Sequence, residues 1–230
     1  VICICVCNRI SNQCPPTLSR IYGHAMSIFY NPSMELYHLL NRGVEKRIVF
    51  IDEEDHVRFV HDLYVFNDRN HVNPNHRFKL LPSGEAREPL VSIHAFSLMP
   101  NHYHMLVSEI VGGGMSTFMR KLNMGYAKYF NEKYERSGVL WQGTFRKKQI
   151  QRDAHFLHMP FYIHLNPLDL VLPQWRDGAV KNTEKALAEL KKYRWSSYLD
   201  YMGSRNFPSV IDRELLDDVL GSKRRQETPA

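Results

Sequence analysis

The sequence has almost no cysteine outside one short segment. Its four cysteines are Cys3, Cys5, Cys7 and Cys14, and the rest of the chain contains none. This distribution argues against a disulfide framework and favours a reducing compartment, so we expect a cytoplasmic protein. Long hydrophobic runs are also missing, because charged residues and histidines interrupt every apolar stretch before the roughly 18 residues that a transmembrane helix needs. The composition, 43% hydrophobic and 23% charged, is typical of a globular protein.

Two widespread catalytic motifs are absent as well. No Gly-x-Ser-x-Gly turn is present to expose a nucleophilic serine. The glycine run at residues 112–114 lacks the Lys-Ser or Lys-Thr pair that completes a phosphate-binding loop. Since cysteine is confined to the start of the chain, tyrosine and histidine become the main candidates for catalytic chemistry.

Residues 1–33 differ from the rest of the chain. They begin with "VICICVC" rather than with Met, and they lack the positively charged start and small-residue cleavage site of a signal peptide. We expect an N-terminal extension that is disordered or does not belong to the true reading frame, with the domain starting near Met34. A metal-binding or redox tract at "VICICVC" is the alternative.

Acidic residues are scarce between residues 120 and 152, although the whole chain is only moderately basic. Its net charge is +6 and its pI is about 9.1. In this segment only Glu132 and Glu135 oppose nine basic residues. These are Arg120, Lys121, Lys128, Lys133, Arg136, Arg146, Lys147, Lys148 and Arg152. A clustered basic excess is typical of a surface that binds a polyanion, and a solvated basic face is the alternative.

Hydrophobic periodicity predicts a domain of the α+β class. Alternating apolar residues predict strands, and apolar residues at helical spacing predict helices. The expected strands are residues 34–41, 89–99, 102–110 and 139–150, and the expected helices are residues 52–66 and 116–136, with a last core helix within 153–167. This order is typical of an antiparallel sheet with helices packed on one face. Residues 173–230 are expected to be a helical appendage, with helices at 183–192 and 212–220.

Two histidines stand one residue apart in "MPNHYHMLV", residues 99–107. Because successive side chains of a strand point to opposite faces, His102 and His104 share one face and Tyr103 points to the other. Two imidazoles on one face of a rigid strand form half of a metal site, and satisfied polar groups at a strand end are the alternative. By ligand chemistry alone, two imidazoles suit Zn²⁺ or another transition metal better than Mg²⁺.

A second motif lies in "FYIHLNP", residues 161–167. Tyr162 and Asn166 are four residues apart and share one face of a helix. An asparagine oxygen can bind a hard cation, and a tyrosine can act as a covalent nucleophile on a phosphate that a cation polarises. A core aromatic residue and a helix C-cap are the alternatives for these two side chains. Pro160 would cost about 3 kcal/mol inside a helix, whereas as the first helical residue it would leave Tyr162 on a very short helix.

Several segments resemble the IS200-like single-tyrosine transposases, and within them the REP-associated tyrosine transposases. The resemblance rests on "YHLLNRG", "SLMPNHYHMLV", "YAKYFNEKYERSGVLWQGTFRKKQI" and "YIHLNPLDLV", and it resumes at "YRWSSYLDYMG". It covers residues 34 to 172 and then this last segment. It implies a ferredoxin-like (RRM-like) palm, which agrees with the order of the predicted elements.

The resemblance also implies a role for each residue of the two motifs. His102 and His104 would be the metal-binding pair of the family's His-hydrophobic-His (HUH) motif. Tyr162 would be the nucleophile, and Asn166 would complete the metal shell. The family's chemistry is cleavage of single-stranded DNA with Mg²⁺ or Mn²⁺, which leaves a 5′-phosphotyrosine link and a free 3′-hydroxyl. Rejoining reverses that step.

The expected partner is single-stranded DNA with hairpin-forming repeats, in DNA transposition or in the processing of such repeats. A homodimer is possible, and no membrane partner is expected. The residues expected to contact DNA phosphates are Arg42, Arg120, Lys121, Lys128, Arg146, Lys147, Lys148 and Arg152. Two other functions stay open at this point. One is a repeat-binding protein on the same fold that has lost cleavage, and the other is a Zn-dependent hydrolase that uses His102, His104 and one more histidine.

Overall fold

The structure is a computed structural model, and it describes residues 35–70, 87–151, 153–177 and 182–218. The expected extension at residues 1–33 lies outside the described residues, and so do Arg152 and most of the polar segment between the first helix and the second strand. Among the described residues, no helix combines the length and the apolar character that crossing a membrane requires.

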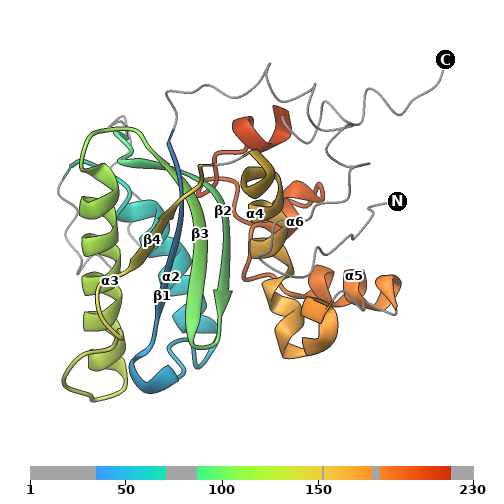
Figure 1. Cartoon of the computed structure of the whole chain (residues 1–230). Helices are drawn as coiled ribbons and strands as arrows, with labels where there is room; N and C mark the ends of the chain where they lie inside the picture. The colour runs from blue at the N-terminus through green and yellow to red at the C-terminus, as the bar shows by residue number, and fades with distance from the viewer. Residues whose placement is uncertain (1–34, 71–86, 152, 178–181, 219–230) are drawn as a thin grey trace.

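Four antiparallel strands form one sheet (Figure 1). They are β1 (Leu36–Arg42), β2 (Val91–Met99), β3 (His102–Glu109) and β4 (Arg146–Gln149). Their order across the sheet is β2-β3-β1-β4, so β1 pairs with both β3 and β4. This arrangement confirms the predicted α+β fold with a ferredoxin-like palm.

Two helices cover one face of the sheet, and a third covers the other (Figure 1). Helices α2 (Glu53–Val65) and α3 (Gly114–Lys133) pack on the face that receives Leu39 and Met105. Helix α4 (Asp153–Leu165) packs on the opposite face, against Leu36 and Leu106. The expectation of helices on one face therefore holds for α2 and α3, while α4 adds a layer on the other side.

The larger core lies between the sheet and the α2/α3 layer. Phe59 of α2 and Tyr126 of α3 are fully buried there, with ring centroids 5.0 Å apart. Helix α2 begins at a capping box, in which the side chains of Asp52 and Asp55 each accept a hydrogen bond from the other residue's backbone amide. Lys133 of α3 bonds the buried Asp55 carboxylate at 2.9 Å, which compensates the cost of burying that charge.

The fourth strand is shorter than predicted. The sequence pattern indicates a strand over 139–150, but only residues 146–149 pair regularly with β1. Trp141 makes one isolated bridge to Gly43 and donates from its indole nitrogen to the Asn123 carbonyl in the core. Leu140 and Trp141 therefore fill space beneath α3 instead of extending the sheet. The short 3-10 turn η2 (Val44–Lys46) follows β1 at the same end.

Helix α4 contains Pro160 in its interior. The helix that carries Tyr162 is therefore not the short one that a start at Pro160 would give. Phe156 and Ile163 anchor it to the sheet on both sides of the proline, and both are buried. Burial of these side chains, at about 1.5–3 kcal/mol each, outweighs the cost of an interior proline.

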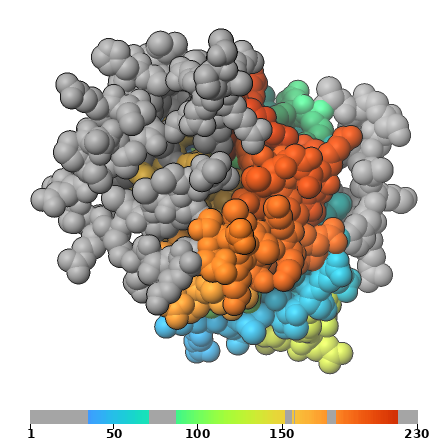
Figure 2. Space-filling view, turned by 90° about the vertical axis from the view of Figure 1, so that its right-hand side faces the viewer, coloured from blue at the N-terminus to red at the C-terminus, as the bar shows by residue number. Residues whose placement is uncertain are grey.

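The chain after α4 packs along the edge of β2. It forms η3 (Asn166–Leu170), η4 (Pro173–Asp177), α5 (Thr183–Lys192) and α6 (Tyr198–Tyr201). The amide of Leu98 donates to the Trp195 carbonyl, and the amide of Ser197 donates to the Phe96 carbonyl, so this segment protects part of the β2 edge. Figure 2 shows the described residues from α5 to residue 218 as one continuous surface on this side of the molecule.

Candidate active site

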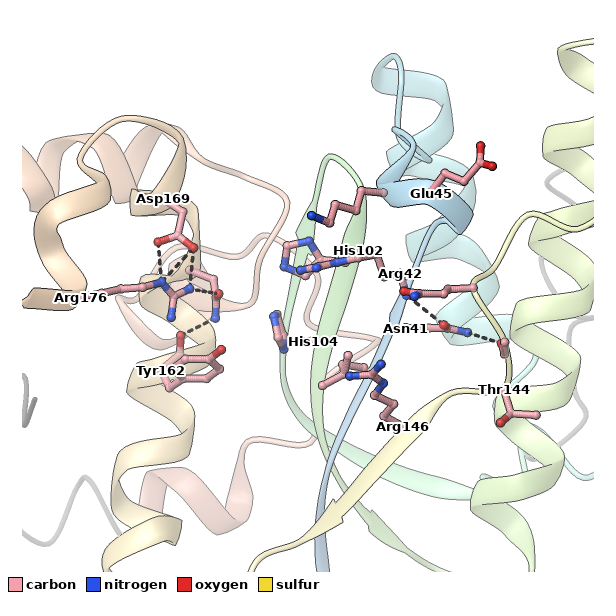
Figure 3. Close-up of a pocket in the computed structure, with 15 residues that line it drawn as sticks. Asn41, Arg42, Glu45, His102, His104, Thr144, Arg146, Tyr162, Asp169 and Arg176 are labelled. Carbon is pink, nitrogen blue, oxygen red and sulfur yellow. Dashed lines mark hydrogen bonds and ion pairs between the residues drawn. The ribbon is translucent and has the colours of Figure 1, made fainter. Parts of the chain in front are cut away.

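A pocket of about 950 Å³ opens between the sheet and the end of α4 (Figure 3). One wall comes from β1 and β3 and carries Arg42, His102 and His104. The opposite wall comes from α4, η3 and η4, and it carries Tyr162, Asn166 and Arg176. The pocket thus joins two motifs that lie far apart in the sequence.

The two histidines of β3 share one face, as the period of a strand requires. Their ring centroids are 5.0 Å apart, and Tyr103 between them is buried in the opposite core. Nδ1 of His102 lies 2.6 Å from Oδ1 of Asn101. The Asn101 amide nitrogen donates to the Lys46 carbonyl, which fixes the orientation of this amide. Since Oδ1 can only accept, Nδ1 of His102 carries the proton and Nε2 keeps its lone pair.

A third histidine, His38 of β1, contacts His104 of this pair. Its Nε2 lies 2.9 Å from Nδ1 of His104, and the two rings stack with centroids 5.1 Å apart. His38 is diagonal to His104 across the strands, because Leu40 is the residue directly opposite. Nδ1 of His104 is therefore engaged, and Nε2 is the ring nitrogen left for a ligand.

The environment keeps both histidines of the pocket neutral at pH 7. Burial, and then the charge of Arg42, lowers the pKa of His102 to about 4. Burial lowers the pKa of His104 as well, and His38 and His102 add to that effect. Neutral imidazole is the form that binds metal ions, so the pair is in the protonation state that a ligand needs.

Tyr162 presents its ring to the histidines from the third turn of α4. Its ring centroid lies 5.6 Å from that of His104 and 5.9 Å from that of His38, and both contacts are edge-on. The guanidinium of Arg176 lies 5.4 Å from the Tyr162 ring centroid on the other side. The interior proline does not turn Tyr162 away from the pocket.

Asn166 uses both ends of its amide within the protein. Its nitrogen donates to the Tyr162 carbonyl at 2.7 Å, which caps the last turn of α4. Its oxygen accepts from Nη2 of Arg176 at 2.9 Å. Arg176 is held in turn by the Asp169 carboxylate, through Nε at 2.8 Å. The hydrogen bonds to Asp169 raise the pKa of Arg176.

The basic residues predicted to contact DNA lie on both faces of the sheet. Arg42 and Arg146 line the pocket, and Lys148 shares their face because it pairs with His38. Lys147 points to the other face, where its ammonium lies 5.7 Å from the Tyr37 ring centroid. Arg152 lies outside the described residues, and the other residues of the set lie on α3, on the far side of the sheet. They are Arg120, Lys121, which donates to the Asp68 carbonyl, and Lys128, which pairs with Glu132.

Residues 53–166 match the protein family described as "Transposase IS200 like". The chain carries an IS200-like transposase domain. This match confirms the family that the sequence motifs predict, and it contains His102, His104, Tyr162 and Asn166.

Two solved structures are also similar to this chain. One is a REP-associated tyrosine transposase bound to a REP hairpin, with 15% identity and a TM-score of 0.46, covering 79% of this chain and 90% of that one. The other is a protein from Deinococcus radiodurans assigned as a transposase, with 14% identity and a TM-score of 0.36, covering 56% of this chain and 88% of that one. None of the curated proteins compared with the sequence matches it.

Three residues at or beside this pocket were not identified from the sequence: His38, Asp169 and Arg176. All three lie outside the segment that matches the family. His38 and Leu40 are two residues apart on a predicted strand, so both are expected on the same face of the sheet. The contact of His38 with His104 depends on how the strands pair, and the sequence does not indicate it. Asp169 and Arg176 stand in a stretch without periodicity, and no signal in the sequence relates them to Tyr162.

Proposed function

We propose that this transposase domain cleaves and rejoins single-stranded DNA through a covalent link between Tyr162 and a 5′-phosphate. The observation that carries the proposal is the placement of Tyr162 beside His102 and His104 in one basic pocket. A tyrosine that served only as a core residue would not need two neutral imidazoles and several cations around it.

The reaction is a transesterification at phosphorus. The Tyr162 oxygen attacks the phosphorus atom, the bond from phosphorus to the 3′-oxygen breaks, and the phenolic proton ends on the released 3′-hydroxyl. In rejoining, the oxygen of the 3′-hydroxyl attacks the phosphorus atom and the bond from phosphorus to the Tyr162 oxygen breaks. Negative charge then develops on the Tyr162 oxygen as it leaves. Arg176, whose guanidinium lies 5.4 Å from the Tyr162 ring centroid, would stabilise that charge. Arg42 and Arg146 are placed to hold phosphates of the strand.

His102 and His104 would hold the divalent ion that the family uses, Mg²⁺ or Mn²⁺. Both histidines suit this role, because their Nδ1 atoms are hydrogen-bonded within the protein and Nε2 is the nitrogen that faces a ligand. Nδ1 of His102 donates to Asn101, and Nδ1 of His104 is hydrogen-bonded to His38. When bound, the ion supplies positive charge to a phosphate oxygen. The Asn166 oxygen already accepts a hydrogen bond from Arg176, so its second lone pair is the one left for an ion. No group of three His, Cys, Asp or Glu side chains able to hold a metal occurs within the described ranges.

Single-stranded DNA with hairpin-forming repeats is the proposed substrate. The mixture of cations and neutral polar groups around the pocket supports a nucleic acid partner over a small anion, because Lys148 extends the basic surface along β4 beyond the pocket lining. A Zn-dependent hydrolase is less well supported. The third histidine that it needs is His38, but the hydrogen bond of His38 to His104 occupies the nitrogen that would bind the metal.

The test is a denaturing gel with Mn²⁺ and a single strand carrying the hairpin repeats that flank the gene. A strand labelled at its 3′ end should stay attached to the protein, and a strand labelled at its 5′ end should be released shorter. Tyr162→Phe and a chelator should each abolish the attachment, and Tyr126→Phe is the control for loss of a tyrosine hydroxyl. Binding without attachment in Mg²⁺ and Mn²⁺ would instead identify a repeat-binding protein that has lost cleavage.

A further inference from the structure

The hydrogen bond between His38 and His104 can form with either of two proton arrangements. The bond joins Nε2 of His38 to Nδ1 of His104 at 2.9 Å. A bond between two neutral imidazoles holds one proton, and either nitrogen can carry it. If His38 donates, Nε2 of His104 must carry a proton and cannot bind a metal ion. If His104 donates, its Nε2 has a free lone pair.

Two features of the pocket favour donation by His104. Arg42 and Arg176 line the same pocket as His104, and a ring lone pair is attracted to cations whereas an N–H dipole is repelled by them. His102 provides a parallel, since its own Nδ1 donates to Asn101 and its Nε2 is free. The two histidines of the motif would then present the same nitrogen.

We propose that His38 is a positioning residue for His104: its Nε2 accepts the Nδ1 proton of His104 and leaves Nε2 of His104 free for the metal ion. Metal-binding histidines are commonly held in one tautomer by an acceptor on their other nitrogen. Here the acceptor comes from the neighbouring strand, and it is itself an imidazole. The identity of the ligand rests on the proposed function, whereas the tautomer does not.

The tautomer can be measured without DNA and without a metal. Long-range ¹H–¹⁵N NMR spectra of the full chain distinguish the two neutral forms of each histidine, and His104→Gln assigns the signals of His104. We expect the Nδ1–H form for His104 in the wild type. In His38→Leu the acceptor is gone, and we expect a change to the Nε2–H form or to a mixture. An Nε2–H form in the wild-type chain would overturn the proposal.

Metal affinity gives a second readout, measured by EPR of free Mn²⁺. We expect His38→Leu to weaken Mn²⁺ binding by about 10- to 100-fold, the usual effect of losing such a partner. His38→Gln places an amide oxygen near the position of Nε2, so it should restore most of the affinity and the Nδ1–H form. Equal losses in His38→Leu and His38→Gln would mean that His38 acts by packing alone, which contradicts the proposal.

His94 provides the matched control. It is a buried histidine on the same side of the sheet, and it bonds the Ser108 hydroxyl at 2.8 Å instead of a motif histidine. His94→Leu should leave the His104 tautomer and the Mn²⁺ affinity unchanged, and a loss equal to that of His38→Leu would overturn the proposal. A chain that keeps both properties but forms no covalent link to DNA would refute the proposed function and leave the role of His38 intact.

Discussion

The alternation of side chains along β4 gives a sharp prediction for DNA binding. Arg146 and Lys148 pair with Leu40 and His38, so they lie on the side of the sheet that carries Tyr162. Lys147 between them lies on the other side and is exposed. The double variant Arg146→Ala/Lys148→Ala should therefore weaken binding of a single strand, whereas Lys147→Ala should not.

The expected size follows from counterion release. Four cationic side chains line the pocket: Arg42, Lys46, Arg146 and Arg176. Lys148 adds a fifth on the same face of the sheet. Each phosphate contact with a single strand contributes about −0.7 to the slope of log K against log salt, so five contacts give about −3.5. Removal of two contacts should change the slope to about −2.1 and weaken binding by about 25-fold at about 0.1 M salt.

The assay is fluorescence anisotropy of a labelled single strand, titrated at several salt concentrations. Lys147→Ala is the control on the same strand, and Lys128→Ala is the control on α3. Equal effects of Lys147→Ala and Lys148→Ala would show that the DNA does not follow the pocket face, and the assignment of this face would then be wrong.

Three further predictions concern other parts of the structure. Arg176→Lys keeps the positive charge, but a lysine cannot bond both Asp169 and Asn166 through a planar fork. Single-turnover formation of the covalent DNA link should therefore slow by about tenfold or more, while the slope of log K against log salt stays the same. An unchanged rate would contradict this. Gly125→Ala would place Cβ 2.4 Å from the Phe66 ring, and urea unfolding should show a loss of about 1–3 kcal/mol. Burial lowers the pKa of His94, so its contribution to stability is present above about pH 6.5 and is lost as the pH falls. In His94→Gln the dependence of the unfolding free energy on pH should be flatter below pH 6.5, by up to about 1.4 kcal/mol per pH unit, as measured by urea titrations between pH 5 and 7.

The fold could be predicted because most of its elements are amphipathic. The bounds predicted for α2 and β3 differ from those observed by one residue at most at each end, and those predicted for α5 agree at both ends. The prediction failed at residues 139–145, where Leu140 and Trp141 are buried in the core and Trp141 makes an isolated bridge to Gly43 instead of a regular ladder. It was also incomplete at Pro160, because the packing of Phe156 and Ile163 that sustains the helix comes from residues distant in sequence.

The basic segment shows a second limit of sequence analysis. Nine positive charges between residues 120 and 152 indicate a polyanion partner, but charge composition does not distinguish the two faces of a sheet. The turn between α3 and β4 carries the chain from one face to the sheet edge. Residues on α3 are thereby separated from Arg146 and Lys148 by the thickness of the sheet, although all of them belong to one segment.

The contact between His38 and His104 depends on strand register, which a single strand does not encode. Period-two alternation fixes the face of His38 but not its neighbour. A shift of β1 by two residues would keep every side chain on its face and yet move His38 away from its place diagonal to His104. The observed register is set by a set of long-range contacts, including the bridge from Gly43 to Trp141 and the bond from the Gly43 amide to the Asn101 carbonyl. A cluster that spans two strands therefore becomes visible only when the sheet is assembled, whereas the His-x-His pair on one strand can be identified from its own short segment.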